Sequence, residues 1–130
     1  MSESQHLDPA ALERLNKLGG AAFVGKMIEL FVDYAGGKVV AARQAQVAGN
    51  LAGVADAVHP IKSSAGNVGA HRVQELALRI EQLAKQGQGE GLGALVGELE
   101  QAFAAVKVEL VEKKSSLSGQ AAGAGTKGSA

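Results

Sequence analysis

The sequence has no cysteine, only two prolines among its 130 residues, and no excess of charge of either sign. Without cysteine, a disulfide framework and a thiolate metal site are both excluded. Lys and Arg together number 13, as do Asp and Glu, so the formal net charge is zero. Nucleic acids and anionic membranes normally bind a basic surplus, and we therefore expect neither as a partner.

Long hydrophobic runs are also missing. No stretch of about 18 apolar residues occurs, although a membrane-spanning helix would need one. The first residues, MSESQHLDPAALERL, are polar and lack the apolar core of a secretion signal. At 13.1 kDa the chain suits one small core. We therefore predict a cytoplasmic, single-domain protein, and the balanced charge without a large exposed apolar seam favours a monomer.

Apolar residues recur at helical spacing along most of the chain, while strand signals are missing. Asp8-Pro9 predicts an N-cap and the first residue of a short helix that ends at Gly19-Gly20. A second helix is predicted from about Ala21 to Ala48, with a break or kink at Gly36-Gly37 as the alternative.

Three further helices follow. One begins after an N-cap at Asn50 and ends at Gly69, the next carries the apolar positions of Val73–Leu83, and the last begins at Leu92. Short loops place successive helices antiparallel. The predicted fold is therefore all-α, an antiparallel up-down four-helix bundle with a short extra N-terminal helix. It occupies residues 1–114, and residues 115–130, rich in Gly, Ser and Ala, are predicted to form a flexible tail.

The helix after Asn50 presents a histidine away from its apolar face. Its apolar stripe repeats in steps of three and four residues and consists of Leu51, Val54, Val58, Ile61, Ala65 and Val68. His59 lies about 130° from the centre of this stripe, toward solvent. The residues within about 60° of it on the helical wheel are Ala52, Ala55, Asp56, Ser63 and Gly66. Lys62 follows one turn later. The neutral imidazole, a nucleophile near pH 7, is thus surrounded by small side chains and one ammonium.

Pro60 is the exception within this pattern. A proline in a helix interior removes one backbone hydrogen bond and crowds the preceding turn. The apolar stripe nevertheless runs across Pro60 without a change of phase, so we expect a kinked but continuous helix.

The run His59-x-x-Lys62-Ser63-Ser64-Ala65, followed by Val68-Gly69-Ala70, resembles the signature of histidine-containing phosphotransfer (HPt) domains of multistep phosphorelays. The likeness extends over roughly residues 8 to 112, through Phe23–Tyr34 and Val73–Leu83. It implies a four-helix bundle whose exposed histidine accepts a phosphoryl group from a receiver-domain aspartate and returns it to another. Ser63 stands where the family often has Gly, which keeps that position small.

The resemblance also implies roles for individual residues. His59 would carry the phosphoryl group on Nε2, and Lys62 would neutralise its charge. Ala55, Ser63 and Gly66 would give the partner access and a docking surface.

Glu81, on the predicted neighbouring helix, has two candidate roles. The favoured one is that of an exposed i,i+4 partner of Lys85. The alternative is to accept a hydrogen bond from the other ring nitrogen of His59 and so orient the ring, a role that Asp56 could also fill.

The function predicted from these features is that of a stand-alone phosphocarrier. Its partners would be a response-regulator receiver domain, a hybrid histidine kinase, or both. No Gly-rich loop with the context of an ATP site occurs, so we do not expect a kinase. We expect no cofactor or metal on this chain: His59 and His71 lack metal-ligand spacing, and the Mg²⁺ of the transfer would be held by the receiver.

A second class of function stays open. A helical adaptor could regulate a receiver or a kinase by docking, without carrying phosphate. The His59–Lys62 pair argues against this alternative, because docking alone requires neither residue. A purely structural bundle would also leave the pair unexplained.

Overall fold

The computed structural model describes residues 7–129, with side chains to residue 117. It contains four helices: α1 (Pro9–Val47), α2 (Leu51–Val68), α3 (His71–Lys85) and α4 (Leu92–Ser129). No strand occurs in this part of the chain. The predicted all-α bundle is therefore confirmed.

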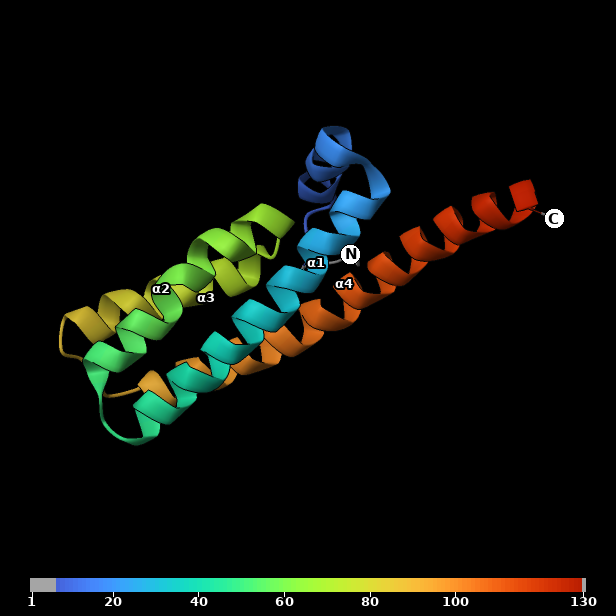
Figure 1. Ribbon diagram of the computed structural model, residues 1–130. Helices are drawn as coiled ribbons and strands as arrows, with labels where there is room; N and C mark the ends of the chain where they lie inside the picture. The colour runs from blue at the N-terminus through green and yellow to red at the C-terminus, as the bar shows by residue number, and fades with distance from the viewer. Residues whose placement is uncertain (1–6, 130) are drawn as a thin grey trace, which may run out of the picture.

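The four helices form a closed ring of neighbours. Each helix packs against the next one in sequence, and α4 returns to pack against α1. In Figure 1, α1 and α4 run side by side along the length of the molecule, while α2 and α3 form a second pair. Short connections after Val47, Val68 and Lys85 make successive helices antiparallel.

The core lies along the axis of the bundle and receives side chains from all four helices. The fully buried aliphatic side chains include Val24, Ile28, Val54, Val58, Ile61, Val68, Val73, Ile80, Leu92, Val96, Leu99, Val106 and Leu110. Five of the six residues in the predicted apolar stripe of α2 are part of this core. Val54, Val58, Ile61, Ala65 and Val68 are buried, and Leu51 is half-buried. The periodicity therefore identified the inner face of α2 correctly.

Helix α1 is interrupted where the sequence predicts the end of the short N-terminal helix. Gly20 has φ 82° and ψ −176°, which is not helical, and the chain changes direction there. The helix then continues through Gly36-Gly37, so the alternative break at this pair is wrong. A Cβ on Gly36 would lie 3.4 Å from the ring of Phe103, an ordinary contact distance, so Gly36 lies where α1 packs against α4.

Helix α2 is continuous from Leu51 to Val68 with Pro60 inside it, as expected from the unbroken stripe. Asn50 caps its start by accepting a hydrogen bond from the N–H of Gly53 at 2.9 Å. The Ser64 hydroxyl donates to the carbonyl of Pro60 at 3.0 Å. His59 is therefore presented from the middle of one helix.

Helix α4 runs beyond the position at which we predict the tail to begin. Its backbone is helical to Ser129, and its last turns extend past the other helices in Figure 1. Leu117 still packs against the core. The domain boundary at residue 115 and the flexibility of residues 115–130 both stay predictions. Within residues 7–129, no helix combines the length and hydropathy that crossing a membrane requires.

The N-terminal segment packs against the turn between α2 and α3. The N–H of Asp8 donates to the carbonyl of Gly69 at 2.8 Å, and Leu12 and Leu15 are buried. Gly69 has φ +81°, and a Cβ there would lie 2.6 Å from the carbonyl oxygen of Asp8. Glycine is required at this turn both by conformation and by space.

We predict that Gly69→Ala destabilises the protein more than Gly87→Ala. Both glycines have positive φ, but nothing lies within 4 Å of a Cβ at Gly87. The left-handed conformation should cost each variant about 1 kcal/mol, and the overlap at Gly69 should add roughly 1–3 kcal/mol. Urea unfolding would measure the free energy of unfolding of both variants. Equal losses of stability would contradict close packing of the N-terminal segment on this turn.

Candidate functional site

His59 stands on the outer side of α2, where the helical wheel predicts it. Its side chain is 64% exposed. Its helical neighbours Val58 and Ile61 are fully buried and hold this part of α2 against the core. The histidine is thus accessible to a partner while its backbone is fixed.

Glu81 of α3 lies directly beside His59. Its Oε2 is 2.6 Å from Nδ1 of His59, and its side chain is only 4% exposed. Lys62 contacts Oε1 at 2.5 Å, and Lys85 contacts Oε2 at 3.1 Å. Both roles considered for Glu81 are therefore present together. The expectation that Glu81 is exposed was wrong, because α3 packs against α2 and covers this carboxylate.

The Glu81 carboxylate is ionised in spite of its burial. Burial by itself raises the pKa of this carboxyl, but the hydrogen bonds from Lys62, His59 and Lys85 outweigh burial and lower the pKa from 4.5 to about 2. An ionised carboxylate can only accept hydrogen bonds. Nδ1 of His59 must therefore carry the proton in this contact, and Nε2 keeps the free lone pair in the neutral ring.

Lys62 points toward Glu81 and is 27% exposed. Its backbone carbonyl accepts a hydrogen bond from the side-chain amide of Gln74 at 3.0 Å. That amide lies over Gly66, where a Cβ would be 2.6 Å from Nε2 of Gln74. Gly66 thus makes room for a link between α2 and α3, a role that helical spacing did not reveal. Its predicted role in partner access stays a prediction.

The other predicted small residues behave differently. Ser63 is exposed, as expected for a residue on the accessible side of α2. Ala55 is buried, so it does not belong to an exposed docking surface. The reason is geometric: α2 packs between α1 and α3, and its buried arc is therefore wider than one apolar stripe. Asp56 is exposed, and Glu81 rather than Asp56 makes the contact with Nδ1.

An apolar groove lies between α1 and the second half of α2, and the sequence pattern alone does not reveal it. It encloses about 260 Å³. Its lining residues are Met27, Leu30, Phe31, Tyr34, Ser64, Asn67 and Val68. Leu30 and Tyr34 are each about half exposed. Helical spacing places both residues on one apolar face of α1 with Met27 and Phe31, but spacing alone does not distinguish the exposed members of such a face from the buried ones.

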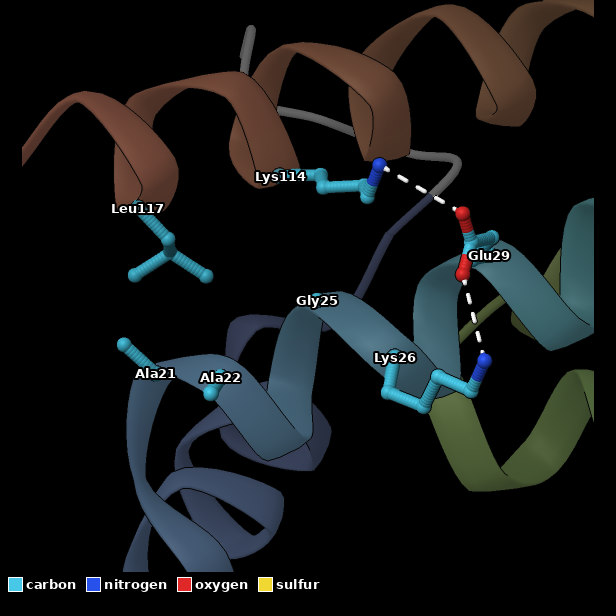
Figure 2. Close-up of a pocket in the computed structure, with 7 residues that line it drawn as sticks. All are labelled: Ala21, Ala22, Gly25, Lys26, Glu29, Lys114 and Leu117. Atoms are coloured by element: carbon cyan, nitrogen blue, oxygen red, sulfur yellow. Dashed lines mark ion pairs between the residues drawn. The ribbon is translucent and has the colours of Figure 1, made fainter. Parts of the chain in front are cut away.

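A second hollow lies between α1 and α4, and Figure 2 shows the residues that line it. There Lys26 and Lys114 both point at Glu29, with N···O distances of 3.5 and 3.8 Å. No residue of α2 or α3 lines this hollow, so it is separate from the His59 site.

The described part of the chain contains no group of three or more His, Cys, Asp or Glu side chains that could hold a metal ion. His71 instead pairs with Asp8, with 3.0 Å between Nε2 and Oδ2.

The ionised Glu81 leads to a prediction about acid stability. Because its pKa in the folded protein, about 2, lies below the ordinary 4.5, the folded state binds fewer protons. The resulting stabilisation is complete above about pH 4.5 and is lost as the pH falls toward 2. We expect Glu81→Gln to lower the free energy of unfolding at pH 7 by on the order of 3 kcal/mol. Urea unfolding at several pH values should show this deficit shrink below pH 4.5.

Glu98→Gln is the matched control, because Glu98 forms an exposed pair with Arg72 at 3.1 Å. An exposed pair of this kind should contribute less than about 1 kcal/mol. Equal losses of unfolding free energy in the two variants would show that the buried cluster stabilises the protein no more than an exposed ion pair does.

Comparison with known proteins places this geometry in a family. The family model described as Hpt domain matches residues 26–109, more than half of the chain. The structure resembles that of histidine-containing phosphotransfer protein B (HptB) from Pseudomonas aeruginosa, with a TM-score of 0.82 and 21% identity, covering 87% of this chain and 97% of that one. It also resembles a candidate histidine-containing phosphotransfer protein from rice, with a TM-score of 0.69 and 18% identity, covering 88% and 85%.

At these identities the two structures show the fold alone. None of the curated proteins matches the chain significantly. The family match and the exposed His59 of an all-α bundle agree with the resemblance of the His59 signature. The chain therefore belongs to the Hpt domain family of histidine phosphotransfer proteins, which act in phosphorelay signalling.

Proposed function

We propose that this protein is a stand-alone phosphocarrier that accepts a phosphoryl group on Nε2 of His59 and passes it on. Hpt proteins are phosphocarrier intermediates rather than classical enzymes, and they interact with receiver domains and kinases. The observation that supports our assignment of Nε2 is the 2.6 Å contact of Nδ1 with the buried Glu81. This contact keeps the proton on Nδ1 and leaves Nε2 as the nucleophile.

The proposed step needs no proton transfer from the ring. The Nε2 lone pair forms an N–P bond with the phosphoryl group of an aspartyl phosphate, and the P–O bond to the aspartate breaks. The electron pair of that bond leaves with the aspartate carboxylate. The ring keeps its Nδ1 proton and gains positive charge as the N–P bond forms. Glu81, at 2.6 Å, then offsets this charge where it develops.

The negative charge of the phosphoryl group would be stabilised by groups on both proteins. In this proposal Lys62 neutralises part of the phosphoryl charge, since it lies one turn from His59 on the same helix. Mg²⁺, which the receiver would hold, supplies charge stabilisation on the partner's side. The monomeric state and the cytoplasmic location expected from the sequence stay predictions.

The apolar groove between α1 and α2 is the proposed docking site of the receiver. Leu30 and Tyr34 are exposed there, and Ser64 and Asn67 bring α2, the helix of His59, into the same surface. An apolar surface of this small size suits a weak, transient complex. A receiver bound along it could therefore place its aspartate near His59 and then dissociate.

We predict that His59→Gln abolishes phosphoryl acceptance and leaves receiver binding intact. A radiolabelled phospho-receiver would be mixed with the wild type and the variant, and the label tested for acid lability and alkali stability. The wild type should acquire acid-labile, alkali-stable label, as phosphohistidine does, and His59→Gln none. His71→Gln is the control, because His71 is also exposed but pairs with Asp8. A wild type that binds phospho-receivers without labelling would favour the adaptor function instead.

We predict that Leu30→Gln weakens receiver docking. Loss of one buried leucine contact should raise the KM for the phospho-receiver by about tenfold, with a smaller change in the rate at saturation. Val40→Gln is the matched control on the same helix: Val40 is 56% exposed and Leu30 50%, but Val40 does not line the groove. Equal effects of the two variants would exclude this groove as the docking site.

A further inference from the structure

The Glu81 carboxylate has two ammonium partners where one would balance its charge. Lys62 Nζ lies 2.5 Å from Oε1, and Lys85 Nζ lies 3.1 Å from Oε2. A buried carboxylate is stable when it is paired and hydrogen-bonded, and a single lysine would neutralise it. With both lysines and a neutral His59 ring, the cluster carries one net positive charge.

The two lysines approach this carboxylate from different elements. Lys62 is on α2, three residues after His59, and is 27% exposed. Lys85 is in the last turn of α3, four residues after Glu81, and is 63% exposed. Only Lys62 shares the helix of His59. Lys85 instead contacts the same oxygen, Oε2, that accepts from Nδ1 of His59.

A phosphoryl group on His59 changes the balance of attraction for Lys62. The group carries close to two negative charges, whereas Glu81 carries one. Lys62 can turn toward the phosphoryl group by loosening its contact with Glu81. If Lys62 were the sole ammonium partner, this movement would leave a buried carboxylate without a lysine, which is costly. Lys85 removes that cost because it remains on Oε2.

We propose that Lys85 is a positioning residue for phosphoryl transfer: it keeps the buried Glu81 paired and in contact with Nδ1, and so frees Lys62 to turn toward the phosphoryl group on His59. This inference rests on the proposed function. The exchange alters an ion pair and no covalent bond, since the Nδ1 proton and the N–P bond are unaffected. Lys85 acts through Glu81 and touches neither the phosphoryl group nor the reacting nitrogen.

The test is a double-mutant cycle between Lys85→Met and Glu81→Gln. Single-turnover transfer from a radiolabelled phospho-receiver would be measured at saturating receiver, so that docking does not enter the rate. In the otherwise wild-type protein, Lys85→Met should slow transfer by roughly threefold to tenfold. In the Glu81→Gln background it should have no effect, because a neutral Gln does not hold Lys62. Lys85→Arg should preserve the wild-type rate.

Lys26→Met is the matched control. Lys26 is 65% exposed and pairs with Glu29 within its own helix, much as Lys85 pairs with Glu81. Its replacement should leave transfer unchanged, and thermal unfolding would verify that every variant is folded.

Three results would overturn the inference. If Lys85→Met slows transfer equally in both backgrounds, Lys85 acts independently of Glu81. If it does not slow transfer in the wild-type background, Lys85 has no positioning role. If the wild type itself accepts no label, the proposed function fails and this inference fails with it.

Discussion

The burial of one ionised carboxylate is the constraint on which the site depends. Glu81 is almost inaccessible to water, yet its pKa is lowered to about 2 because three nitrogen donors surround it. A buried charge of this kind requires partners at fixed positions. Those partners are His59, Lys62 and Lys85, so the same electrostatic requirement that stabilises the packing of α3 against α2 also orients the imidazole of His59.

The bundle supplies the rigidity that this arrangement needs. His59 and Lys62 come from α2, whose inner face is fully buried, and Glu81 and Lys85 come from α3. Gln74 adds a second link between these helices by donating to the carbonyl of Lys62 across Gly66. A side chain on one packed helix that is held by a contact with the next helix has little conformational freedom left to lose. The accessible part of the ring and the apolar groove of α1 and α2 remain exposed beside this rigid arrangement.

Much of this molecule could be predicted from local sequence patterns. The periodicity of α2 identified its buried face, and the positions of Asn50 and Gly69 identified its ends, because capping and helical spacing depend on nearby residues. Continuity through Pro60 and the break at Gly20 followed in the same way. The continuity of α1 through Gly36 and Gly37 was harder to predict. Gly36 lies beside the ring of Phe103, a residue of α4 that is distant in sequence.

The sequence by itself determined the class of fold, the candidate histidine and the family signature, because each depends on residues within a few turns of one helix. Only the tertiary structure decided that Glu81 is buried and shared by three partners, that Ala55 is covered, and that Leu30 and Tyr34 remain exposed. Those properties depend on which helices lie side by side. A helical wheel gives the direction of a side chain, but the neighbouring helix determines whether water, an ammonium or another side chain meets it.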